Sequence, residues 1–195
     1  MYREDSSGNA SNVLGDSWNI YRQVKRIKIP EGIVSIGKRA FNGCRQLENI
    51  DIPNSLTKIE DEVFRNCNNL QSINLPNSLT IIGKCAFEYC TSLQSINIPN
   101  DVTRIEECTF KDCRNLSVFE LSKNIRYIGL GAFDNCTSLS KIVIWRNVEE
   151  LGYRTFDKWT SEQTVNFEVE EVQEGWDENW NYNCNAKIVF GYTGQ

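Results

Sequence analysis

The residues best suited to chemistry in this chain are its eight cysteines, because the chain contains no histidine. A histidine general base and mixed Cys/His zinc sites are therefore excluded. Zinc sites usually pair cysteines about two to four residues apart. Here five cysteines recur only once in every 23 residues: Cys44, Cys67, Cys90, Cys113 and Cys136. We interpret this column as small buried residues that fill a narrow interior, with a metal site or a redox relay as the alternative. Disulfides are possible but not required.

Other reactive groups do not form a catalytic set. Carboxylates are plentiful, for example at Glu60, Asp61, Glu106 and Glu107. Without a predicted cleft they do not indicate a glycosidase-type pair, and no glycine-rich phosphate loop is present. We therefore predict that the protein is not an enzyme and needs no metal or cofactor.

Composition narrows the possible partners and locations. The net charge of −5 argues against nucleic acid, whose binders usually carry a basic patch. No apolar run approaches the roughly 18 residues that a membrane span needs, so we expect no membrane insertion. Residues 1–20 lack the apolar core of a signal peptide. We expect a surface or secreted protein if a signal peptide has been removed, and otherwise a cytoplasmic one.

The elements that position these residues form an internal repeat of 23 residues. One column holds only phenylalanine: Phe41, Phe64, Phe87, Phe110, Phe133 and Phe156. A second holds leucine: Leu47, Leu70, Leu93, Leu116 and Leu139. A third is mostly isoleucine: Ile27, Ile50, Ile73, Ile96, Phe119, Ile142 and Val165. All four prolines share one further column: Pro30, Pro53, Pro76 and Pro99. Such regularity predicts a repeat architecture.

Each repeat reads as one coil of a solenoid. Ile50 and Ile52 alternate with polar Asp51, which is the periodicity of a strand. Pro53 follows and ends the strand, because proline cannot donate to a sheet. Phe64 and Cys67 stand three residues apart, which favours one short helical turn. No coil can bury its apolar side alone, so the coils must stack around a shared core.

The motif resembles the BspA-like class of leucine-rich repeats. Residues Cys44-Arg-Gln-Leu47-Glu-Asn-Ile50-Asp-Ile52-Pro53, followed by Leu56, Ile59 and Phe64, match its pattern closely. The resemblance covers roughly residues 24–167. It implies an α/β-type repeat solenoid, a right-handed coil with a parallel sheet on one face and short helical turns opposite. It also implies a bacterial or protist surface protein that binds other proteins or host matrix.

The register predicts three segments. Residues 1–23 form an N-terminal tail and cap that includes Trp18, Ile20 and Tyr21. Residues 24–167 form the solenoid, with a leading strand and six repeats. Residues 168–195 form a C-terminal cap, in which Ile188 and Phe190 add a last strand. Two covered ends indicate a monomer.

The side chains that point out of the sheet make the candidate binding face. They are Arg26, Lys28, Asn49, Asp51, Ser72, Asn74, Ser95, Asn97, Val118, Glu120, Lys141, Val143 and Trp145. The face runs from basic, through neutral and polar, to partly apolar. Exposed Trp145 is typical of interface anchors, although it could instead pack on Ser122 and the cap.

The leading hypothesis is a non-catalytic protein-interaction scaffold with a role in bacterial cell-surface adhesion or host interaction. The alternative is a carbohydrate or cell-wall binding module that uses Trp176 and Trp180. Buried rings that plug the last coil are the competing interpretation of these two tryptophans.

Overall fold

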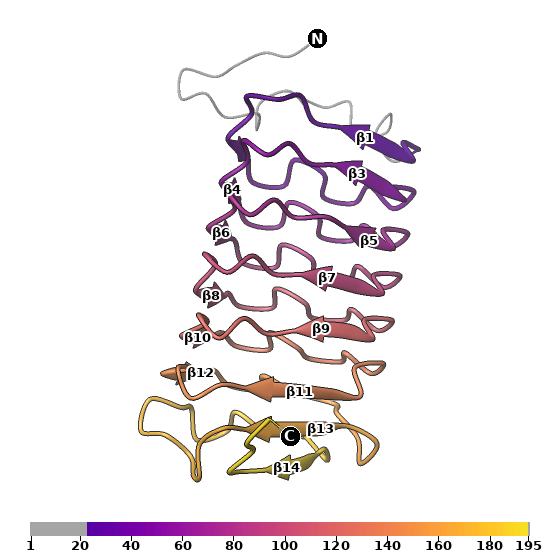
Figure 1. The fold of residues 1–195 in the computed structure, drawn as a ribbon. Helices are drawn as coiled ribbons and strands as arrows, with labels where there is room; N and C mark the ends of the chain where they lie inside the picture. Colours follow the sequence, from indigo (N-terminus) through magenta and orange to yellow (C-terminus); the bar gives the residue numbers. More distant parts are fainter. Residues whose placement is uncertain (1–22, 195) are drawn as a thin grey trace.

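The computed structural model describes residues 23–194 as a stack of coils with two rows of strands (Figure 1). The predicted N-terminal cap residues Trp18, Ile20 and Tyr21 lie outside the described residues. The front row contains β1 (Arg26–Lys28), β3 (Asn49–Asp51), β5 (Ser72–Ile73), β7 (Ser95–Asn97), β9 (Val118–Glu120), β11 (Lys141–Ile144), β13 (Thr164–Phe167) and β14 (Lys187–Val189). The return row contains β2 (Ser35–Ile36), β4 (Lys58–Ile59), β6 (Ile81–Ile82), β8 (Arg104–Ile105), β10 (Tyr127–Ile128) and β12 (Glu150–Leu151).

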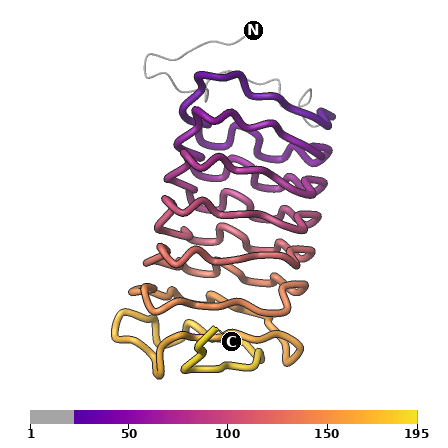
Figure 2. Tube along the Cα trace, in the orientation of Figure 1, coloured from indigo at the N-terminus to yellow at the C-terminus, as the bar shows by residue number. Residues whose placement is uncertain are grey.

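All strand pairs are parallel and keep one register along the chain. Ile27 lies opposite Ile50, and Ile142 lies opposite Val165, so each residue pairs with its equivalent in the next repeat. Figure 2 shows that successive coils follow one another along a single axis from the N-terminal to the C-terminal end. The predicted leucine-rich-repeat solenoid is therefore confirmed.

The predicted short helical turns are wrong, since residues 23–194 contain no helix. A helix would need each N–H to bond to the carbonyl four residues earlier. Instead, the N–H of Phe64 donates to the carbonyl of Ala86 in the next coil at 2.8 Å, and the N–H of Cys67 donates to the carbonyl of Phe64 at 3.1 Å. Glu62 and Asn66 adopt left-handed φ angles of 57° and 60°. The segment is thus a chain of tight turns that is hydrogen-bonded to its neighbour.

The phenylalanine column forms the centre of the core. Neighbouring rings from Phe41 to Phe156 stack with centroids 5.4 to 6.1 Å apart and with interplanar angles of 4° to 17°. Phe119 takes the place of an isoleucine in the strand column and contacts the rings of Phe110 and Phe133 edge-on. Burial of these rings is a large part of the apolar gain from stacking.

The cysteine column is buried, as its packing interpretation requires, and it also forms hydrogen bonds. The thiol of Cys90 donates to the carbonyl of Phe64 at 3.1 Å, and the thiol of Cys113 donates to the carbonyl of Phe87 at 3.2 Å. In the last repeat Trp159 replaces the cysteine, and its indole N–H donates to the carbonyl of Phe133 at 2.9 Å. The column therefore supplies a second donor to buried carbonyls that already accept one backbone N–H, as the carbonyl of Phe64 does from Cys67.

The C-terminal segment closes the stack. β14 adds a further rung beside β13, with Ile188 opposite Val165. The ring of Phe190 stacks on Phe167 at 5.0 Å. After β14 the chain turns back, and the N–H of Tyr192 donates to the carbonyl of Phe167 at 2.9 Å. β14 is only three residues long, and such a short strand offers other chains only a limited free edge.

Replacement of Phe87 by alanine tests the ring column. Phe87 is completely buried between two stacked rings, so Phe87→Ala should lower the free energy of unfolding by about 3–5 kcal/mol. The measurement is chemical denaturation followed by circular dichroism. Ile81→Ala on the exposed side of β6 is the control and should change stability by about 0.5 kcal/mol or less. Equal effects of both substitutions would contradict the assignment of the core.

The buried thiols predict a loss of stability in alkali. Burial raises the pKa of Cys44 from 9.0 to about 11, and it raises the pKa of Cys90 further. Folded thiols keep protons that unfolded thiols release, so the free energy of unfolding should be constant for these groups below pH ~9 and should fall as the pH rises through the folded pKa values. Each thiol contributes about 1.4 kcal/mol per pH unit in that window.

The variant Cys90→Ser isolates this effect, because serine keeps a donor but does not ionise in the same range. Its free energy of unfolding should fall less steeply than that of the wild type between pH ~9 and ~11, by about 1.4 kcal/mol per pH unit. Denaturant titrations at several pH values measure both slopes. Identical slopes would show that Cys90 does not retain its proton in the folded chain.

Candidate binding face

The front row of strands carries the candidate binding face, with Asn74 and Trp145 directly after β5 and β11. Strand alternation points one set inward, for example Ile73 and Ile96, and the other set outward. Of the thirteen predicted residues, ten are exposed and three, Ser95, Val143 and Trp145, are half-buried. Stacking in register turns each outward position into a column that runs the length of the solenoid.

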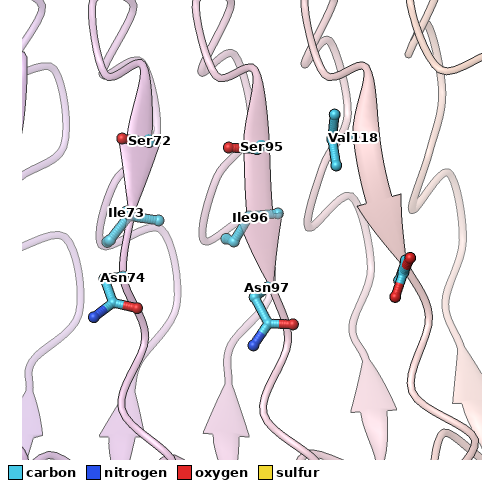
Figure 3. A pocket seen from close by; sticks show the side chains of 8 residues that line it. Ser72, Ile73, Asn74, Ser95, Ile96, Asn97 and Val118 are labelled. Carbon is cyan, nitrogen blue, oxygen red and sulfur yellow. The ribbon is translucent and has the colours of Figure 1, made fainter.

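A shallow groove of about 390 Å³ crosses the middle of this face (Figure 3). It lies over β5, β7 and β9, and its lining residues are Ser72, Ile73, Asn74, Ser95, Ile96, Asn97, Val118 and Glu120. Figure 3 shows the side chains of Asn74 and Asn97 arranged alike on neighbouring strands, with Ser72 and Ser95 forming a second pair. The groove combines hydroxyl and amide groups with an exposed valine.

The groove includes two residues that the sequence pattern assigns only to the core. Ile73 and Ile96 are 6% and 5% exposed and form part of the groove lining between the serines and asparagines. Their column is inward-facing in every repeat, so the sequence offers no signal that two members reach the surface. Val118 is 63% exposed and is the most exposed apolar residue in the lining of this groove.

The polar groups of this face have no partners within residues 23–194. No hydrogen bond or ion pair of the described residues uses a candidate side chain other than that of Trp145. The return side differs, because its charges neutralise one another. Lys84 pairs with Glu107 at 2.7 Å, and Arg104 pairs with Glu106 at 2.7 Å. The front face therefore keeps its donors and acceptors available.

The side chain of Trp145 makes two contacts within its own chain that the sequence pattern does not predict. Its indole N–H donates to the carbonyl of Leu121 at 2.7 Å, and the ammonium of Lys123 lies 4.5 Å from the ring centroid. Close by, the backbone N–H of Arg146 donates to Glu168 at 3.0 Å and lowers the pKa of that carboxyl, with a further contribution from the Arg146 guanidinium. This network stiffens the C-terminal end of the face.

Trp176 and Trp180 lie in the cap with their rings buried. They are 6% and 4% exposed, and their ring centroids lie 4.9 and 5.1 Å from that of Phe167. The indole N–H of Trp176 donates to the carbonyl of Val148 at 3.2 Å. Stacking on a sugar needs an open ring face, so the structure gives no support to the carbohydrate-binding alternative.

The described residues hold no group of three or more Cys, Asp or Glu side chains arranged to ligate a metal ion. A helix with the length and apolarity of a membrane span is likewise not found in residues 23–194.

Solved structures with the same fold come from several bacteria. A leucine-rich repeat protein of T. pallidum is 32% identical, with a TM-score of 0.63 over 68% of this chain and 62% of its own. One from Bacteroides ovatus is 25% identical, with a TM-score of 0.52 over 87% of this chain and 56% of its own. A leucine-rich cell surface protein of Faecalibacterium prausnitzii is 22% identical, with a TM-score of 0.54 over 91% and 63%. The chain thus spans 56% to 63% of these proteins.

No curated protein matches the sequence. The sequence does match the model of the BspA-type leucine-rich repeat region, with six copies over residues 16–80 and 57–187. These matches cover most of the solenoid and agree with its coil length and parallel register. The chain belongs to the BspA-type leucine-rich-repeat family.

Proposed function

We propose that the protein is a non-catalytic scaffold that binds another protein through the front face of its solenoid. The observation that carries this proposal is the contrast between the two sides. Charged groups on the return side form ion pairs, whereas the outward side chains of the front row, Trp145 excepted, have no partner in the described residues. Unpaired donors beside exposed apolar atoms are what a protein interface needs.

The centre of the proposed interface is the groove over β5, β7 and β9. Val118 supplies the exposed apolar contact, and Asn74 and Asn97 supply amide groups that can donate and accept hydrogen bonds. Arg26 and Lys28 extend the face with positive charge at one end, and Trp145 forms its rim at the other. Because the strands are stacked in a rigid core, the face loses little conformational freedom on binding.

An adhesion or host-interaction role is the more specific form of this proposal. It is supported by family membership and by the bacterial origin of the related structures, one of which is described as a cell surface protein. In this form the partner is a protein on another cell or in the matrix around it.

Substitution of Val118 by arginine tests the position of the interface. Val118→Arg places a charge in the groove, and it should weaken binding by about 1–3 kcal/mol, a factor of roughly 5 to 150. Partners captured by the wild-type chain are first identified by mass spectrometry. Immobilised extracellular-matrix proteins are tested for binding in parallel. Their affinities for wild type and variant are then measured by surface plasmon resonance.

Ile81→Arg is the matched control on the return side, where Ile81 is 48% exposed. It introduces the same side chain on the other row of strands and should leave affinity within about twofold of wild type. Thermal melts of both variants show whether the fold is retained. Unchanged affinity of Val118→Arg with a clear loss for Ile81→Arg would move the interface to the return side and refute the proposal.

We also propose that the chain is a monomer, because the last rung is followed by a turn that packs back on Phe167. Light scattering coupled to size-exclusion chromatography should give the 22.5 kDa mass of one chain. A concentration-dependent dimer would show that an end of the stack pairs with another copy.

A further inference from the structure

Two cysteines outside the buried ladder, Cys85 and Cys108, occupy the same position in adjacent coils. Their column lies just after the return strands and contains Arg39, Glu62, Cys85, Cys108, Gly131 and Arg154. All six residues have left-handed φ angles between 53° and 61°. Identical backbone conformations in stacked coils place equivalent side chains next to one another along the stack.

The geometry of this column suits a direct bond between neighbours. In the two preceding coils, the guanidinium of Arg39 makes two hydrogen bonds to the carboxylate of Glu62, at 2.8 and 3.0 Å. Cys85 and Cys108 occupy the equivalent positions in the next two coils, and both are free cysteines. Stacked rungs lie about 4.8 Å apart, which is within the range of roughly 4.4–6.8 Å between the Cα atoms of a disulfide.

The pair is accessible, whereas the cysteines of the ladder are not. Cys85 and Cys108 are half-buried, but Cys90 and Cys113 are fully buried. The next coil has Gly131 in this column, and a Cβ atom at that position would lie 3.6 Å from the sulfur of Cys108. Because glycine has no side chain there, the column leaves the sulfur of Cys108 uncovered on that side.

The charges around the pair distinguish the two sulfurs. The neighbouring thiol of Cys85 and, to a smaller extent, the ammonium of Lys111 lower the pKa of Cys108 against the effect of its burial. The neighbouring thiol of Cys108, burial and the carboxylate of Glu88 raise the pKa of Cys85. The thiolate is the nucleophile in thiol–disulfide exchange, so these surroundings favour attack by Cys108.

We propose that Cys85 and Cys108 form a reactive dithiol that low-molecular-weight disulfides, such as oxidised glutathione, convert into a disulfide between coils. The Cys108 thiolate attacks one sulfur of oxidised glutathione, forms a mixed disulfide and releases one glutathione thiolate. Cys85 then loses its proton to solvent and attacks the Cys108 sulfur, which displaces the second glutathione. Two cysteine thiols are oxidised, and one glutathione disulfide is reduced to two thiols. The bond links the coils of β5 and β7, which carry the groove of the front face.

The test treats the reduced, folded chain with oxidised glutathione at mildly alkaline pH and maps its peptides by mass spectrometry without reduction. The proposal predicts a loss of two hydrogen atoms and a linked pair of peptides that contain Cys85 and Cys108. Cys90 and Cys113 are the matched control, because they have the same spacing in the same two coils but are buried. Preferential linkage of the control pair, or no linkage of either pair, would overturn the proposal.

Single variants test the assignment of the attacking sulfur. Cys85→Ser should accumulate a stable glutathione adduct on Cys108, whereas Cys108→Ser should react at Cys85 at least about tenfold more slowly. Circular dichroism verifies that both variants are folded. Equal rates for the two variants would contradict the role of Cys108, and the peptide map of the wild type decides the proposal even if one variant is unstable.

Discussion

The backbone hydrogen bonds between equivalent positions of adjacent coils are the constraint on which the whole structure depends. They occur in both strand rows and also in the turn segment, where the N–H groups of Phe64 and Phe87 donate to the next coil at 2.8 and 3.0 Å. No coil can satisfy these groups alone. A constant repeat length of 23 residues keeps these bonds in register from coil to coil.

Fixed register converts sequence columns into physical columns with distinct roles. The phenylalanine rings stack along the axis, and the cysteine thiols cap one buried carbonyl in each coil. Trp159 replaces the cysteine in the last repeat, and its indole N–H makes the same bond. On the outside, the same register brings serine beside serine and asparagine beside asparagine, which creates the groove of the proposed interface.

Most of the fold could be predicted from the sequence because periodic apolar residues report directly on burial. Ile50, Leu47 and Phe64 recur at fixed positions, so the core and the outward face follow from the register. The turn conformation could not be predicted. Residues such as Glu62 and Cys85 adopt left-handed φ angles without a glycine to indicate them, and hydrogen bonds to the next coil compensate for the strain.

The sequence pattern predicts which positions point outward from the sheet, but it does not predict the contacts that their side chains make. The bond from Trp145 to Leu121 and the cover provided by Lys123 depend on side-chain directions that spacing does not reveal. The same holds for the ion pairs that neutralise the return side and leave the front side unpaired.

Native-state hydrogen exchange tests the account most directly. The amide hydrogens of Phe64 and Phe87 in the turn segment should be protected as strongly as those of β5 and β7, because all of them report the same opening between coils. If the turn amides exchange at the rate of an unfolded chain while the strand amides stay protected, then the strands alone hold the coils together, and the central claim is wrong.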